Sequence, residues 1–152
     1  MDRYDKQILA LLQEDATLPV AEIGERVGLS STPCWRRIQK LEEAGLIRKR
    51  VALLDAAKLN AGVTVFVSVR TSQHNVKWLK QFHGVVSSIP EVTEFYRMAG
   101  DTDYLLRVVV PDIAAYDRVY KNLIQGAELA DVSSSFAMEQ IKYTTALPLD
   151  YA

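Results

Sequence analysis

Two patterns in the 152-residue sequence predict an α+β protein made of two small domains. Segments of helical periodicity, separated by short joints, fill the first fifty residues. Strand signals of period two begin at residue 63 and alternate with two further helical segments. The predicted fold is an N-terminal winged helix-turn-helix followed by a C-terminal ferredoxin-like βαββαβ domain. We expect the first domain to span 1–54, a linker to span 55–62 and the second domain to span 63–152.

The first domain contains three predicted helices, each followed by a residue that ends helices. Pro19 follows the first, Gly28 the second and Gly45 the third, and glycine after a periodic run marks a helix C-terminus. Ser30 offers a side-chain oxygen that would cap the third helix. The residues expected to face inward are Tyr4, Ile8, Leu11 and Leu12 in the first helix, Val20, Ile23 and Val27 in the second, and Cys34, Ile38 and Leu41 in the third.

Residues 46–54 have the β-branched content and the length of two short strands, which would form the wing. Six elements are then expected in the order strand, helix, strand, strand, helix, strand. The expected strands cover 63–70, 91–99, 103–110 and 131–142, and the helices cover 75–89 and a segment opened by Pro111. The inward residues of these helices are expected to be Val76, Leu79, Phe82, Val86 and Ile89, then Ile113, Tyr116, Tyr120 and Leu123.

Two helices can cover only one face of a four-stranded sheet. The strand valines from Val63 to Val69 are expected beneath them, together with Tyr104, Leu106, Val108 and Val110. The other face would carry Phe66, Leu105, Val109, Phe136 and Met138. That face is too apolar to lie in water, so we expect a second copy of the chain to cover it.

The charge of the chain is distributed unevenly, although its formal net value is only −1. The segment from Arg36 to Arg50 carries six basic and two acidic residues. A short basic patch on an otherwise acidic chain favours contact with a polyanion.

The pattern helix, Val27-Gly28-Leu29-Ser30, helix is typical of a helix-turn-helix, whose second helix enters the major groove of DNA. Arginine can donate two hydrogen bonds to a guanine edge, and lysine neutralises phosphate. A plain three-helix bundle with a charged surface is the alternative. Trp35, on a flank of the third helix, is expected to cover the edge of the core, with a DNA contact as the other possibility. The candidate DNA-binding residues are Ser31, Thr32, Arg36, Arg37 and Lys40 in the third helix and Arg48, Lys49 and Arg50 in the wing.

A second candidate site is the glycine-containing loop 100–103 between two predicted strands. Gly100 lets backbone N–H groups approach a ligand carboxylate closely. A carboxylate of Asp101 or Asp103 can accept hydrogen bonds from an ammonium group. The alternative is a hairpin turn in which glycine and aspartate serve only the turn geometry. The candidate ligand-binding residues are Met98, Gly100, Asp101, Asp103 and Tyr104.

Other chemistries find little support in the sequence. Cys34 is the single cysteine, so no internal disulfide is possible; we expect a small buried side chain, with a redox sensor as the alternative. Two histidines without a Cys/His cluster argue against a metal site, and the serines at 133–135 lack a partnered base, so we expect no catalytic residues and no cofactor. No apolar run approaches the about 18 residues of a membrane span, and the charged N-terminus lacks a signal-peptide pattern, so a cytoplasmic protein is expected.

Three stretches make the sequence resemble the Lrp/AsnC (feast/famine) family of bacterial and archaeal transcription regulators. The first is Leu29-Ser-Ser-Thr-Pro-Cys-Trp-Arg-Arg-Ile-Gln-Lys-Leu-Glu-Glu-Ala-Gly-Leu-Ile, preceded by Tyr4-Asp-Lys-Gln-Ile-Leu. The others are Gly100-Asp-Thr-Asp-Tyr-Leu and the closing Phe136-Ala-Met-Glu-Gln-Ile-Lys. Within the family, Thr32-Pro-Cys-Trp-Arg-Arg and the closing stretch are most similar to the branch linked to cysteine response and detoxification.

The resemblance implies a C-terminal domain that dimerises by sheet-to-sheet packing and dimers that often assemble further, commonly into octamers. It also implies an amino-acid effector, bound between subunits beside the Gly-Asp-x-Asp loop, that shifts assembly or DNA affinity. Thr102 departs from the aromatic or other larger residue that the family often carries there, so the resemblance does not give the shape of the pocket.

We therefore expect a sequence-specific DNA-binding transcription regulator and not an enzyme. Its expected partners are double-stranded DNA, a small amino acid and further copies of itself. The alternatives are a winged-helix adaptor for other proteins and a metabolic subunit, without DNA binding, built on the ferredoxin-like domain. Salt-dependent DNA binding separates the regulator from both alternatives, because only contacts to phosphates release counterions.

Overall fold

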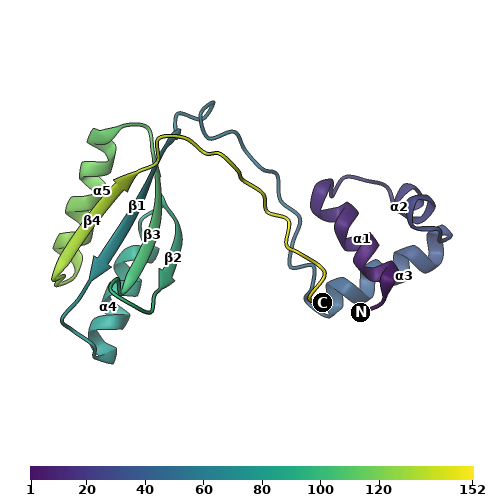
Figure 1. Ribbon diagram of the computed structural model, residues 1–152, viewed down its shortest axis with the longest axis horizontal. Helices are drawn as coiled ribbons and strands as arrows, with labels where there is room; N and C mark the ends of the chain where they lie inside the picture. Colours follow the sequence, from purple (N-terminus) through teal and green to yellow (C-terminus); the bar gives the residue numbers. More distant parts are fainter. The chain divides into compact units, whose positions relative to one another are not determined.

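The computed structural model describes residues 1–152, which form five helices and one four-stranded sheet (Figure 1). The chain divides into two compact units, here called unit 1 (Met1–Leu53 with Ile141–Ala152) and unit 2 (Leu54–Gln140). The sequence analysis placed all residues after 63 in the second domain, whereas the structure groups the C-terminal segment with the N-terminal unit. Each helix is too short or too polar to cross a membrane.

Unit 1 contains the three predicted helices, α1 (Arg3–Glu14), α2 (Val20–Val27) and α3 (Ser31–Glu43). Their apolar stripes meet in one small core, as the periodicity predicted, except that Leu9 is buried and Tyr4 remains exposed. The buried members of this core are Ile8, Leu9, Ile23, Val27, Cys34, Ile38 and Leu41.

The N-cap residues of α1 and α3 test how well capping rules predict the start of a helix. Asp2 and Asp5 form a reciprocal capping box at the start of α1, each side chain accepting the other's backbone N–H at 3.0–3.1 Å. Ser30 has the extended conformation of an N-cap but makes no side-chain cap, so that prediction is wrong. Pro33 occupies the third helical position and has no N–H to donate, so one of the two usual donors for such a cap is missing.

The two strands predicted for residues 46–54 are also absent, because residues 48–55 have no regular structure. A strand needs a neighbour that accepts and donates its backbone hydrogen bonds. All strand pairing in the structure lies within unit 2. The apolar side chains of this segment, among them Val51, Leu53 and Leu54, are consequently exposed.

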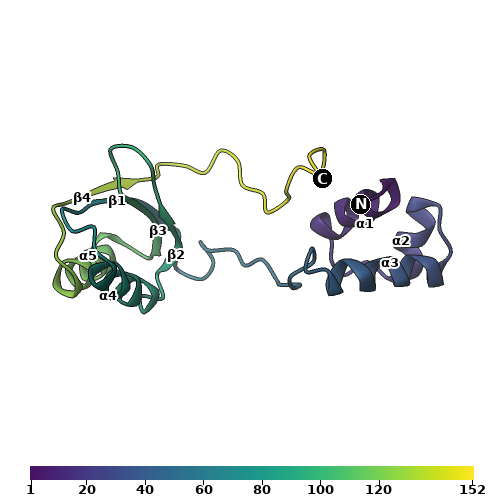
Figure 2. The same ribbon diagram turned by 90° about the horizontal axis from the view of Figure 1, so that it is seen from below.

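Unit 2 has the predicted βαββαβ order and a single antiparallel sheet with strand order β2-β3-β1-β4. Both helices lie on one face of this sheet (Figure 2). The strands are β1 (Val63–Arg70), β2 (Val92–Arg97), β3 (Tyr104–Val110) and β4 (Asp131–Phe136), and the helices are α4 (Val76–Ser87) and α5 (Ile113–Gly126). This arrangement confirms the ferredoxin-like fold.

The core of unit 2 lies between the sheet and the two helices. Alternate residues of β1 and β3 are fully buried there, as predicted, and Trp78 and Phe82 fill the α4 side. Val76 and Ile113 were expected to face inward but are 69% and 70% exposed. Each is the first residue of its helix and follows the N-cap residue directly.

The opposite face, here called the open face, carries Phe66, Leu105 and Val109 as predicted, joined by Tyr96. Phe136 was assigned to this face wrongly. It pairs with Val65, whose side chain faces the helices, and its ring packs edge-on against Tyr116. β4 also ends at Phe136 and not at residue 142. Phe136 pairs with Val65, the N–H of Ala137 still bonds to the carbonyl of Thr64 at 2.9 Å, and the start of β1 at Val63 leaves no partner beyond Met138. Beyond the strand, Met138 is exposed.

The C-terminal segment of unit 1 is held against α1 by a side-chain amide. Gln13 donates from Nε2 to the carbonyl of Leu147 at 3.2 Å and accepts the N–H of the same residue at 2.6 Å. Leu149 packs against the core of the three helices. The segment is thus a fourth component of this unit.

Candidate functional site

The turn between α2 and α3 sets the position of the candidate DNA-binding helix. Gly28 adopts a φ of 79°, a left-handed conformation that glycine reaches without strain. The N–H of Leu29 bonds to the carbonyl of Gly24 at 2.8 Å. A Cβ at Gly24 would lie only 2.6 Å from the carbonyl oxygen of Leu29, so the close approach of the turn to α2 requires glycine there.

Helix α3 presents one side to the core and the other to solvent. Cys34, Ile38 and Leu41 are buried, as the helical wheel predicted. Cys34 is inaccessible, and burial raises the pKa of its thiol, which argues against a role as a redox sensor. The exposed side carries four of the candidate DNA-binding residues together with an aromatic side chain that was expected to pack: Ser31, Thr32, Arg36, Lys40 and Trp35.

Arg37 has a different environment from these residues. Its guanidinium lies 2.7 Å from a carboxylate oxygen of Asp2 and 2.8 Å from one of Asp5, and it stacks over the ring of Tyr4. The backbone N–H of Asp5 and this guanidinium together hold the pKa of Asp2 below its usual value. The side chain therefore ties α3 to the start of α1, a contact that the sequence analysis did not foresee.

The basic triplet Arg48, Lys49 and Arg50 follows directly after the end of α3 and is exposed. Gly45, with a φ of 72°, turns the chain there. The guanidinium of Arg50 lies 2.8 Å from a carboxylate oxygen of Glu42 in α3, so one member of the triplet is held against the helix. Six cationic side chains of unit 1 thus lie on α3 or shortly after it, without a wing.

The second candidate site is the connection between β2 and β3. The N–H of Met98 bonds to the carbonyl of Asp103 at 2.8 Å and closes a short loop. Gly100 within it has a φ of 113°, so this position requires glycine. Met98 and Asp101 are exposed, and backbone groups and a carboxylate are accessible together on this loop.

Two other predicted members of this site are engaged within the chain. One carboxylate oxygen of Asp103 accepts the backbone N–H of Thr71 at 2.8 Å, which joins the loop to the end of β1. Thr71 is the buried polar residue of the chain and had no signal in the sequence analysis. Tyr104 is 6% exposed and packs among Phe82 and Phe95, so it is a core residue.

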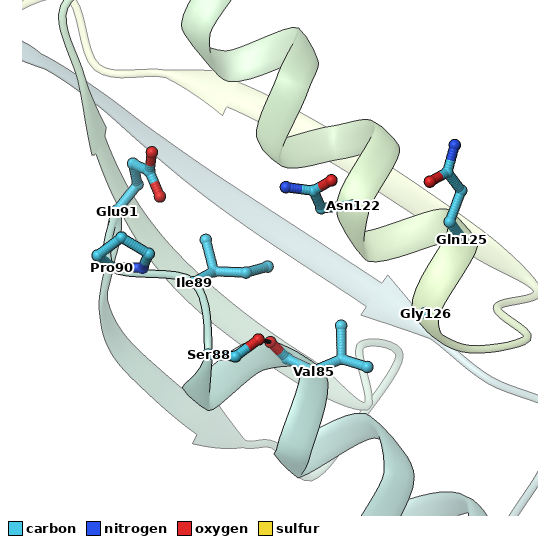
Figure 3. A pocket seen from close by; sticks show the side chains of 8 residues that line it. All are labelled: Val85, Ser88, Ile89, Pro90, Glu91, Asn122, Gln125 and Gly126. Atoms are coloured by element: carbon cyan, nitrogen blue, oxygen red, sulfur yellow. Dashed lines mark hydrogen bonds between the residues drawn. The ribbon is translucent and has the colours of Figure 1, made fainter.

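A hollow of about 310 Å³ lies between the C-terminal ends of α4 and α5 (Figure 3). None of the predicted site residues lines it. Strand β2 runs from Val92, next to the hollow, to Arg97, next to the loop, so the two lie at opposite ends of that strand. The lining residues are Val85, Ser88, Ile89, Pro90, Glu91, Asn122, Gln125 and Gly126.

Two family models match the two parts of the chain. Residues 1–42 match the AsnC-type helix-turn-helix domain, and residues 64–147 match the Lrp/AsnC ligand binding domain. The DNA-binding transcriptional activator DecR of Escherichia coli K12 is 49% identical over 151 residues, which cover 99% of each chain.

Solved structures give the same result. An AsnC family transcriptional regulator from Agrobacterium tumefaciens has 69% sequence identity and a TM-score of 0.96, with 99% of each chain covered. The transcriptional regulator NMB0573 of Neisseria meningitidis, solved as a complex with L-Met, has 37% identity and a TM-score of 0.94 and covers 99% of this chain and 98% of its own. The chain therefore belongs to the Lrp/AsnC family of transcriptional regulators.

Proposed function

We propose that this protein regulates transcription by placing the exposed face of α3 in the major groove of duplex DNA, under the control of a small amino acid bound by unit 2. The observation that supports this most directly is the exposed, partly basic surface of α3 behind a tight glycine turn. A helix-turn-helix presents its second helix in this manner. The chain acts in the cytoplasm as a regulator and not as an enzyme.

On this proposal, the exposed polar and basic side chains of α3 and of the triplet after it divide into two groups. Arg36 lies directly opposite the buried stripe and can donate two hydrogen bonds to a guanine edge, while Ser31 and Thr32 contact bases or phosphates at the helix start. The longer cations neutralise phosphates and position the helix: these are Lys40, Arg48, Lys49 and Arg50. Arg37 is left to hold α3 on α1.

The amino acid would bind at the loop between β2 and β3. Backbone N–H groups beside Gly100 hold the α-carboxylate, and Asp101 accepts hydrogen bonds from the α-ammonium. Met98 contacts the ligand side chain, whereas Asp103 shapes the loop through Thr71. The L-Met complex of NMB0573 supports an amino acid as the ligand class. The resemblance to the cysteine-responsive branch makes cysteine one of the ligands to test.

A second copy of the chain would cover the open face of the sheet. Phe66 and Tyr96 on that face are 39% and 51% exposed in the single chain, and burial of such a surface stabilises a dimer. Dimers of this kind can assemble further, up to octamers. A ligand regulates only if it binds one assembly or DNA state more tightly than the other.

The proposal is tested by selecting duplexes with the purified chain from a randomised library and then adding each of the twenty amino acids. We expect recovery of a defined sequence, and a shift of its affinity with one or a few amino acids. The same amino acids should raise Tm, because a ligand that binds the folded state stabilises it. Failure to enrich any sequence at low ionic strength would overturn the proposal and favour an adaptor or a metabolic subunit.

A further inference from the structure

Trp35 is a large aromatic side chain that α3 leaves half in solvent, with 51% of its surface exposed. The other tryptophan of the chain, Trp78, is 7% exposed. It stacks on Phe82 with ring centroids 4.9 Å apart and donates its indole N–H to the carbonyl of Glu128 at 2.9 Å. The chain thus uses one tryptophan for packing, while the expectation that Trp35 covers the core edge is wrong.

The position of Trp35 extends the proposed DNA-binding face. At about 100° per residue, it lies about 100° from Arg36 on the wheel and about 160° from Arg37 on the opposite flank. Arg37 is on the flank that is tied to α1, so Trp35 occupies the free flank. Trp35 is also the fifth residue of a helix that begins at Ser31, within the part of a recognition helix that meets base edges.

The exposed surface of α3 therefore combines an apolar and a cationic side chain. A single exposed apolar residue is ordinary on a protein surface. Here, however, the indole belongs to the residue before Arg36, which is assigned to a guanine edge, and both side chains are exposed on α3. The apolar feature of the major groove is the C5-methyl group of thymine. A rigid, flat indole covers such a group with little loss of side-chain freedom.

We propose that Trp35 contacts a thymine methyl in the major groove, next to the base pair read by Arg36, and so selects thymine at that position. This inference rests on the proposed function, because it requires α3 to lie in the groove. It assigns to one aromatic residue a share of the sequence specificity that charge alone cannot supply, since phosphate contacts carry no sequence information.

The first test compares thymine with uracil in a duplex that the intact chain has selected from a randomised library. Uracil lacks only the methyl group and keeps the hydrogen-bonding pattern. Replacing the contacted thymine should weaken binding by the parent chain and leave binding by Trp35→Ala unchanged. The variant itself should bind the thymine duplex roughly tenfold to a hundredfold more weakly. Ile113→Ala, which removes an exposed apolar side chain from unit 2, should bind like the parent.

The second test needs no loss of affinity. Acrylamide, a neutral quencher, should quench Trp35 in the free chain and reach Trp78 poorly. The selected duplex should protect the quenchable component, and Trp35→Phe should lack that component altogether. Protection that appears on raising the protein concentration, without duplex, would show that a second copy covers the indole and would overturn the inference.

The two proposals fail in distinguishable ways. A parent chain that binds its duplex but is indifferent to uracil at every position overturns the thymine contact and leaves the regulator intact. Equal affinities of parent and Trp35→Ala do the same. If no duplex is enriched at all, the proposed function and the inference fall together.

Discussion

Arg36 and Arg37 are adjacent in the sequence but have opposite surroundings in α3. Arg36 is exposed on the side away from the core, where its charge is available to a polyanion. Arg37 is half-buried between Asp2 and Asp5, which compensate its charge. The same residue type is thus available for recognition at one position, as we propose, and joins two helices at the next.

Replacing each arginine by alanine should separate these roles. Arg36→Ala should weaken binding of the selected duplex by about 1–3 kcal/mol and leave Tm unchanged, because it removes base contacts and no internal contact. Arg37→Ala should lower Tm, because Asp2 and Asp5 lose their partner. Gel-shift titrations and thermal denaturation measure the two effects. An Arg36→Ala chain that binds as tightly as the parent would remove this residue from the interface.

Asp101 and Asp103 form a second pair of like residues with different surroundings. Asp101→Ala should blunt the amino-acid response in gel-shift titrations while DNA binding without ligand stays near normal, since on our proposal the exposed carboxylate binds the ligand and does not contact DNA. Asp103→Asn should retain the response, because the amide oxygen can still accept the N–H of Thr71. Asp103→Ala should lose the amino-acid response, because the loop between β2 and β3 loses its hydrogen bond from Thr71. A full response from Asp101→Ala would exclude that residue from the site.

Sequence periodicity identified buried and exposed residues well wherever a helix or strand decides them, as with Cys34, Ile38 and Leu41. It could not distinguish Arg36 from Arg37, because the partners of Arg37 lie 32 and 35 residues away on another helix. The role of Asp103 was out of reach for the same reason, since Thr71 carries no local signal. Trp35 lies on the boundary of the wheel, where the angle alone does not fix burial.

At the scale of elements, the α2–α3 turn depends on the absence of a side chain at Gly24. Gly24→Ala should cost about 1–3 kcal/mol, because its Cβ would meet the carbonyl oxygen of Leu29 at 2.6 Å and α3 would shift. Gly84→Ala is the matched control, since a Cβ there meets nothing within 4 Å. It should stabilise α4 by about 0.5–1 kcal/mol through helix propensity. Denaturant unfolding measures both, and a neutral Gly24→Ala would contradict the packing described for this turn.

The type and order of the nine elements could be predicted, because capping residues, prolines and two distinct periods mark them in the sequence. The wing was predicted wrongly, because residues 46–54 have strand composition but pair with no strand of the chain. The predicted length of β4 was wrong for a related reason. The start of β1 at Val63 limits β4 to Met138 at most, and this limit is a property of the pairing and not of the residues around Phe136.

At the scale of the whole molecule, the open face of unit 2 predicts self-association. Phe66→Lys places a second positive charge directly opposite Arg107, beside Leu105 and Val109, and should convert the assembly to monomers, because like charges repel and are costly to bury together. Light scattering at micromolar concentration measures this. Ile113→Lys, in α5 on the other side of the sheet, should leave the assembly intact. A parent chain that is monomeric under these conditions would contradict the dimer.

The packing of the C-terminal segment in unit 1 was beyond sequence reasoning. Gln13 and Leu147 are 134 residues apart, and a glutamine in a helix carries no sign of a backbone partner. The two-domain organisation was otherwise visible, since a change from helical to strand periodicity separates the units. The predicted ligands of the two units, DNA and an amino acid, were inferred from residue chemistry and from the family resemblance together.

The measurement that tests the account most directly is the affinity of the intact chain for its selected duplex as salt concentration is raised. Neutralised phosphates release counterions, so the logarithm of the binding constant should fall linearly with the logarithm of the salt concentration, with a slope of several units. Lys40→Ala should reduce that slope by about one. Affinity that does not change with salt, or no binding at low ionic strength, would contradict the conclusion that α3 and its neighbouring cations bind DNA.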